Sequence, residues 1–153
     1  MTSWAIVDYF QRPKPAYFTI KRELRPYTVG MTRKEKKTYP DELSEAKVTV
    51  ETVLEVWGTN STLEAKKAVL EMTSYKLDDP TYVNKWREER VTLRPNASTE
   101  LFAGKVPELA PPRTKLSEVQ PTVVVSARLV DERGVVLGRY SNWCVTRPCF
   151  LVT

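Results

Sequence analysis

The sequence of 153 residues contains no histidine. This absence excludes serine–histidine and cysteine–histidine nucleophile pairs and every metal site built on imidazole ligands. Only two cysteines occur, Cys144 and Cys149, close to the end of the sequence. A four-ligand metal site would need two further partners, so the sequence predicts no metal and no cofactor, and a local disulfide stays open. Carboxylates, lysine and tyrosine remain as the chemistry to consider.

Long apolar runs are also missing. No stretch of eighteen apolar residues occurs, and no basic segment followed by an apolar one stands at the amino end. The sequence therefore predicts no membrane partner and no secretory signal, and it favours an intracellular location. Two glycosylation sequons, at Asn60 and Asn96, would matter only in the secretory pathway. The sequence leaves their use open.

The composition is that of a globular protein, with 41% hydrophobic and 28% charged residues. The net charge of +5 is modest. The basic run at residues 33–37 is interrupted by Glu35 and lacks flanking aromatic residues in a recognisable motif. A solvated loop or strand edge is therefore favoured over a phosphate-binding patch, and no nucleic-acid partner is predicted.

From Tyr27 onward, apolar residues alternate with polar ones at the period of a β-strand. The alternation is clearest at Val123, Val125, Ala127 and Leu129, which are predicted to face inward, whereas Val124 is predicted to face solvent. Seven short strands with turns between them indicate an immunoglobulin-like β-sandwich, a mainly-β fold of antiparallel strands. The predicted strands lie at residues 27–33, 48–57, 68–73, 86–93, 99–103, 123–129 and 135–140.

A short helix is predicted over residues 16–24, between Pro15 and Pro26. Tyr17, Ile20 and Leu24 share one of its faces. A helix of about nine residues is unstable alone in water, so this apolar stripe must meet a partner. The partner is either the sandwich of the same chain or a surface from elsewhere.

The segment from Ser3 to Phe10, followed by Arg12, Lys14 and Tyr17, resembles the end of the catalytic (β/α)₈ barrel in β-mannosidases of glycoside hydrolase family 2. Residues 54–62 and 124–143 resemble the same family, and most closely its fungal branch. The resemblance implies three regions: residues 1–26 as a remnant of the last barrel helix and its linker, 27–143 as an immunoglobulin-like domain, and 144–153 as a divergent tail. The chain is thus expected to be a fragment or a truncated gene model.

The resemblance also implies a function. In this family the catalytic glutamates lie on earlier barrel strands, so this chain is expected to be a non-catalytic C-terminal portion. Its parent enzyme would hydrolyse terminal non-reducing β-D-mannose residues of β-D-mannosides, with the barrel as partner of this portion and the substrate reached only through the parent. Trp4 alone would lie near the substrate in the intact enzyme, either against a sugar or as a wedge beneath the barrel rim.

The carboxylates of the chain itself do not predict a catalytic pair. Glu88 and Glu89 are neighbours on a predicted strand, so their side chains point to opposite faces. Asp78 and Asp79 fall in a predicted loop and are interpreted as solvated turn residues. No catalytic residue is therefore predicted.

Two alternatives to this function stay open, a free-standing carbohydrate-binding module and a protein-interaction module. The first would use an aromatic face made of Trp57, Tyr75 and Tyr82. Against that use, Trp57 and Trp86 are predicted as core or inter-domain residues rather than sugar-stacking ones, because aromatic side chains commonly dominate cores.

Overall fold

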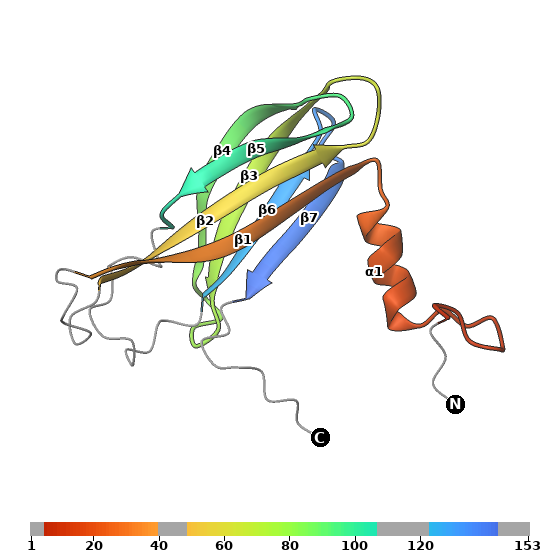
Figure 1. Cartoon of the computed structure of the whole chain (residues 1–153), viewed down its shortest axis with the longest axis horizontal. Helices are drawn as coiled ribbons and strands as arrows, with labels where there is room; N and C mark the ends of the chain where they lie inside the picture. The colour runs from red at the N-terminus through yellow and green to blue at the C-terminus, as the bar shows by residue number, and fades with distance from the viewer. Residues whose placement is uncertain (1–4, 40–48, 107–122, 144–153) are drawn as a thin grey trace.

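The computed structural model describes residues 5–39, 49–106 and 123–143 (Figure 1). Trp4, Cys144 and Cys149 lie outside the described residues. The described part of the chain forms one helix and seven strands. These are α1 (Pro15–Glu23), β1 (Tyr27–Thr38), β2 (Thr49–Asn60), β3 (Lys66–Lys76), β4 (Val83–Leu93), β5 (Ala97–Gly104), β6 (Val123–Val130) and β7 (Val136–Trp143).

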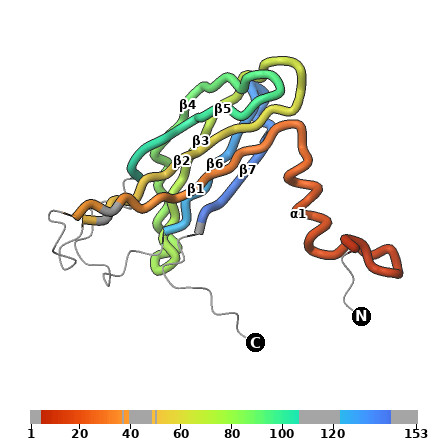
Figure 2. Tube along the Cα trace, in the orientation of Figure 1, coloured from red at the N-terminus to blue at the C-terminus, as the bar shows by residue number. Residues whose placement is uncertain are grey.

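The strands form two antiparallel sheets that pack face to face (Figures 1 and 2). One sheet has three strands in the order β1-β2-β5, and the other has four in the order β4-β3-β6-β7. Every strand pair is antiparallel. The predicted mainly-β sandwich of seven antiparallel strands with one short preceding helix is confirmed.

The core lies between the sheets and is built from alternate residues of each strand. The predicted inward face of β6 is confirmed, because Val123, Val125, Ala127 and Leu129 are fully buried. The prediction that Val124 faces solvent is wrong, since only 6% of it is exposed. Strand β6 lies between β3 and β7, so neighbouring strands flank Val124 on both sides of the outer face as well.

The two tryptophans on strands β2 and β4 differ in burial. Trp86 is partly buried and packs edge-on against Phe102 of the opposite sheet, with ring centroids 5.4 Å apart. Trp57 is not a core residue, which corrects the core alternative of its prediction and leaves the inter-domain alternative as a prediction. Its neighbour Val56 points into the core, so Trp57 points to the outer face of the three-stranded sheet and stays 37% exposed.

The basic run lies in strand β1, at the edge of the three-stranded sheet, which confirms the strand-edge alternative of the prediction and not the loop. One of its members, Arg33, points inward and ties the two sheets together, because its Nη2 donates to the carbonyl oxygens of Val123 at 2.6 Å and Asn142 at 3.3 Å. On the outer face, Lys34 forms an ion pair with Glu55 at 2.7 Å. Arg33 and Lys34 of this run therefore stabilise the sandwich.

The two sequons occupy different environments. Asn60 ends β2 and is buried, and its amide donates to the carbonyl oxygen of Glu64 at 2.7 Å while its Oδ1 accepts from the backbone of Thr62 at 2.8 Å. Asn96 is exposed in the turn between β4 and β5, with a left-handed φ of 44°. The Asn60 side chain thus holds the β2–β3 turn closed.

Candidate functional site

Helix α1 projects beyond the end of the sandwich, near β7 (Figures 1 and 2). Pro15 stands in its first turn, as predicted, and none of its residues is buried. Within the predicted stripe, Ile20 and Leu24 are both exposed. Because nine residues cannot sustain a helix in water by themselves, this exposed stripe indicates a surface made to be covered.

A tight turn precedes the helix at residues 7–13, and one ion pair defines it. The backbone N–H of Asp8 donates to the carbonyl oxygen of Arg12 at 2.9 Å. In return, the Asp8 carboxylate accepts from the Arg12 backbone N–H at 2.8 Å and from its Nε at 2.7 Å. Between them, Gln11 takes a left-handed φ of 60°. We call this segment the aromatic turn, for the side chains at its tip.

The aspartate of the aromatic turn has a structural role. The hydrogen bond from the Arg12 backbone N–H, assisted by the Arg12 side chain, holds the pKa of Asp8 below its usual value. The carboxylate is therefore ionised at neutral pH and remains a hydrogen-bond acceptor. Asp8 is suited to fixing the turn and not to proton transfer.

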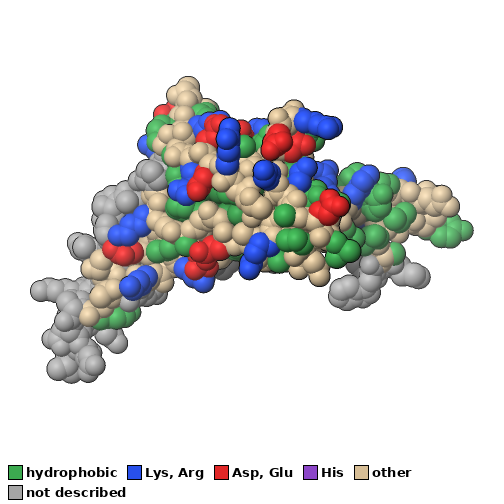
Figure 3. All heavy atoms as spheres, turned by 90° about the horizontal axis from the view of Figure 1, so that it is seen from above, with side chains coloured by type: hydrophobic (Ala, Val, Ile, Leu, Met, Phe, Trp, Pro, Cys, Tyr) green, Lys and Arg blue, Asp and Glu red, His purple; other side chains and the backbone are tan. Residues whose placement is uncertain are grey.

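The aromatic turn displays two rings to solvent. Tyr9 is 94% exposed and Phe10 is 71% exposed, and their ring centroids lie 5.4 Å apart in an edge-to-face arrangement. Hydrophobic side chains gather at this projecting end in the space-filling view (Figure 3). We call this surface the apolar end and define it as Ile6, Tyr9, Phe10, Phe18, Ile20 and Leu24, all of them exposed. Exposed apolar clusters of this kind mark interaction sites.

A basic depression of about 540 Å³ lies between α1 and the strands β6 and β7. Two of its arginines are paired, Arg22 with Glu23 at 2.9 Å and Arg128 with Glu71 at 3.4 Å. The full lining is Phe18, Thr19, Arg22, Arg25, Arg128, Val136 and Arg139. Four arginines beside the apolar end favour a partner surface that is apolar with acidic residues at its edge.

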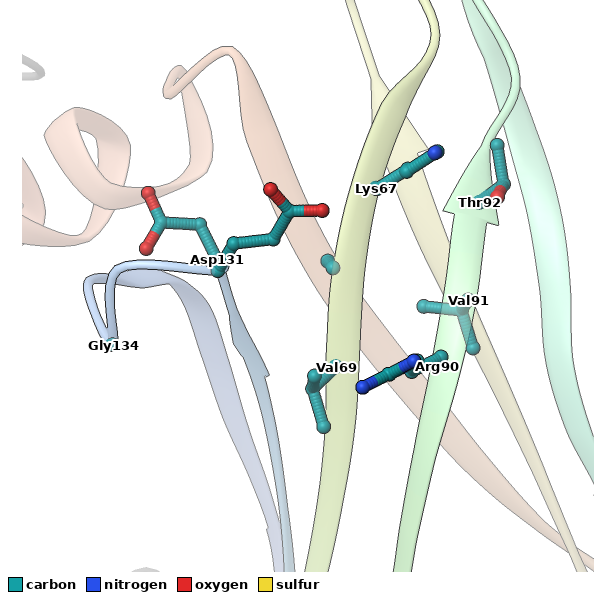
Figure 4. A pocket seen from close by; sticks show the side chains of 9 residues that line it. Lys67, Val69, Arg90, Val91, Thr92, Asp131 and Gly134 are labelled. Atoms are coloured by element: carbon teal, nitrogen blue, oxygen red, sulfur yellow. The ribbon is translucent and has the colours of Figure 1, made fainter.

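A second depression, about 700 Å³, is bordered by β3, β4 and the β6–β7 turn. Asp131 of the turn lies across it from Lys67 and Arg90 of the strands (Figure 4). The Asp131 carboxylate accepts from the backbone N–H groups of Val135 at 2.8 Å and Arg133 at 2.9 Å. The Val135 hydrogen bond, the stronger influence, lowers the pKa of Asp131. Asp131 therefore serves to close the hairpin.

The carboxylates that the sequence offers as catalytic candidates lie in ion pairs or in turns. Glu88 and Glu89 lie on opposite faces of β4, as predicted, since Glu88 pairs across the sheet with Glu71 and Glu89 with the buried Leu70. Glu88 contacts Lys85 at 2.6 Å, and this hydrogen bond lowers its pKa. A general acid in a glycosidase needs a raised pKa instead.

The loop aspartates are solvated, as predicted. Both Asp78 and Asp79 are exposed. The Thr81 hydroxyl donates to Asp79 at 2.6 Å and lowers the pKa of this carboxyl group, which fixes the loop. In residues 5–39, 49–106 and 123–143, no three acidic, cysteine or histidine side chains converge as metal ligands would. The one described helix is too short and too polar to span a bilayer.

The aromatic residues proposed for a carbohydrate-binding face do not lie together. Trp57 is on the outer face of the three-stranded sheet, whereas Tyr75 is on β3 in the other sheet. Tyr82 lies in the β3–β4 connection, where the Lys76 ammonium stands 4.3 Å from its ring centroid. The continuous three-residue platform suggested by the sequence is therefore wrong.

Sequence reasoning missed the aromatic turn and the basic depression. The spacing of Asp8 and Arg12 could have indicated the turn, because residues four apart with opposite charge can close such a loop. The depression had no local signal, since its arginines come from α1, the α1–β1 connection, β6 and β7.

Comparison with known proteins identifies relatives that match most of the chain. A family model described as "Mannosidase Ig/CBM-like domain" matches residues 52–146. Beta-mannosidase B of Thermothelomyces thermophilus is 39% identical over 145 residues, which is 94% of this chain and 16% of that protein. Beta-mannosidase B of Emericella nidulans is 30% identical over 92% of this chain and 15% of its own length. The chain thus spans less than a fifth of the curated relatives it matches.

A solved structure shares the fold. The crystal structure of β-D-mannosidase from Dictyoglomus thermophilum superposes with a TM-score of 0.58 and 20% identity, covering 92% of this chain and 14% of that one. With the family match over residues 52–146, these relatives confirm the resemblance stated from the sequence. The seven-stranded sandwich is therefore immunoglobulin-like, and the chain belongs to the mannosidase Ig/CBM-like domain family of β-mannosidase-type proteins.

Proposed function

We propose that this chain is the non-catalytic C-terminal immunoglobulin-like portion of a β-mannosidase and that its apolar end, which precedes the immunoglobulin-like domain, packs against the rest of the catalytic barrel of that enzyme. The parent enzyme removes terminal non-reducing β-D-mannose residues from β-D-mannosides. One observation carries the docking proposal: an ordered turn holds Tyr9 and Phe10 almost wholly in solvent. The names and lengths of the relatives support the presence of a larger partner.

Exposure of the Tyr9 and Phe10 rings to water is unfavourable in free energy. Exposed aromatic rings lose the favourable free energy of burial, which amounts to about 1.5–3 kcal/mol for a side chain of this size. An ion pair and a left-handed residue nonetheless hold these rings at the tip of a turn. Burial against a second surface would recover this free energy, and the four arginines beside it would select an acidic edge on that surface.

The division of the chain follows from the same proposal. Residues 1–26 are the last helix and linker of the barrel, residues 27–143 are the immunoglobulin-like domain, and residues 144–153 are a divergent tail. Trp4, which lies outside the described residues, would contact substrate only when the barrel is assembled around it. The domain itself contributes no catalytic group in this proposal.

The purified chain should release no aryl alcohol from an aryl β-mannoside. The reason is that a retaining glycosidase needs two facing carboxyl groups, whereas Glu88 and Glu89 point to opposite faces of β4 and Asp8 is hydrogen-bonded to Arg12 in a turn. The assay compares the chain with an intact β-mannosidase at equal molar concentration. Turnover that co-purifies with the chain and disappears in Asp8→Asn, Glu88→Gln or Glu89→Gln would overturn the non-catalytic half of the proposal.

A further inference from the structure

Trp57 occupies an unusual place on the outer face of the three-stranded sheet. Among the described side chains of β1, β2 and β5, it is the only large apolar one that is exposed. It lies on the central strand, since β2 is flanked by β1 and β5. Core packing therefore does not explain why a single exposed indole lies in the middle of this sheet face.

The neighbouring strand leaves room for the indole to lie against the sheet. Gly30 of β1 pairs directly with Trp57. A Cβ atom placed on Gly30 would stand 2.7 Å from Cε2, 2.8 Å from Cζ2 and 2.9 Å from Nε1 of the indole. The ring thus lies across the Gly30 backbone, in space that any larger residue would fill. This contact restricts the orientation of the exposed ring.

Polar groups surround the indole on the same face. Glu100 of β5 pairs with Trp57 across the sheet. Thr28 of β1 and Thr59 of β2 lie two residues from Gly30 and Trp57 on their strands, and their hydroxyls are hydrogen-bonded to each other. In the other direction, Glu55 lies two residues before Trp57 on β2 and forms its ion pair with Lys34. Polar and charged side chains therefore occupy the sheet positions next to the indole, across β5 and along the strands in both directions.

We propose that Trp57 is a stacking platform for a sugar ring of a mannoside chain. A pyranose has an apolar C–H face and a rim of hydroxyls, so a restricted indole with polar groups around it complements both. A protein-docking surface would instead surround its central aromatic with further apolar side chains. The platform rests on the geometry of this face, whereas the choice of mannose rests on the proposed function.

The test is calorimetric titration of the chain with a β-1,4-linked manno-oligosaccharide. Trp57→Ala should weaken binding about tenfold or more, the equivalent of about 1.4 kcal/mol, because the stacking surface is removed. Tyr75→Ala is the matched control, since Tyr75 is 39% exposed on the outer face of the other sheet, and its affinity should be unchanged. Thermal melts establish that each variant is folded.

A second variant keeps the tryptophan and changes only its orientation. Gly30→Ala places a methyl group where the indole lies, so the ring must move and affinity should fall although Trp57 is present. Absence of binding by the folded chain, or unchanged affinity in Trp57→Ala, would overturn the platform. Equal affinity for a cello-oligosaccharide would support the platform and overturn the assignment to mannose. Neither result bears on docking through the apolar end, which is measured separately.

Discussion

Val125→Asp is expected to abolish cooperative folding of the sandwich. Val125 is fully buried in the core on β6, the strand between β3 and β7. A carboxylate at this position would be buried without a compensating partner, at a cost of several kcal/mol. Such a loss is comparable to the whole stability of a domain, about 5–15 kcal/mol. Urea unfolding followed by circular dichroism measures it.

The matched control is Val83→Asp. Val83 begins β4, an edge strand, and is 60% exposed, so the same chemical change there should cost less than about 0.5 kcal/mol. Val124 is unsuitable as a control because it is nearly buried on the other face of β6. Equal losses of stability in the Val125 and Val83 variants would show that the assignment of inner and outer faces is wrong.

Deleting residues 1–24 is expected to convert a self-associating chain into a monomer without destabilising the sandwich. The deletion removes the whole apolar end, whose exposed side chains favour association in solution. Among the described residues 5–24, it removes no side chain of the core, because α1 buries none of its residues. Sedimentation velocity measures the association, and scanning calorimetry measures the melting temperature, which should change little.

A smaller change separates the rings from the helix that follows them. Tyr9→Ser with Phe10→Ser retains the Asp8–Arg12 ion pair and helix α1 but removes the two most exposed rings of the aromatic turn. This variant should show much of the same loss of self-association. If the deletion instead unfolds the sandwich, the segment is an integral part of the domain, and docking on a separate barrel is contradicted.

The strands could be predicted because burial imposes a period of two on the sequence. Leu54 and Val56 on β2, and Leu70 and Met72 on β3, alternate with exposed or half-buried residues and are fully buried. The inward face of β6 follows the same pattern. In a half-buried sheet, the alternation along one strand therefore shows which of its residues face the core, even when the neighbouring strands are unknown.

Positions that depend on neighbouring strands were not predictable. Val124 is covered because β6 is central, and strand order is not visible in a local pattern. The basic run continues β1 because Arg33 finds carbonyl acceptors on β6 and β7, far away in the sequence. Trp57 was predicted from its size to be a core or inter-domain residue, and the alternation of β2 places it on the outer face, away from the core.

The interaction surface could be predicted only in part. The helical spacing of Tyr17, Ile20 and Leu24 indicated an apolar stripe that needs a partner, and the structure shows this stripe without a buried residue. The basic depression could not be predicted, since Arg25 and Arg139 meet only when the chain folds. Local periodicity reports what an element buries, but not which distant charges lie beside it.

Hydrogen exchange tests the central claim most directly, with the chain measured alone and in place of the corresponding domain of a full-length β-mannosidase. In the isolated chain, residues 5–24 should open at little free-energy cost while residues 123–140 stay protected. In the full-length protein, residues 5–24 should gain protection because the barrel covers Tyr9, Phe10 and the stripe of α1. Equal protection of residues 5–24 in both proteins would contradict docking of this domain on the barrel through its apolar end.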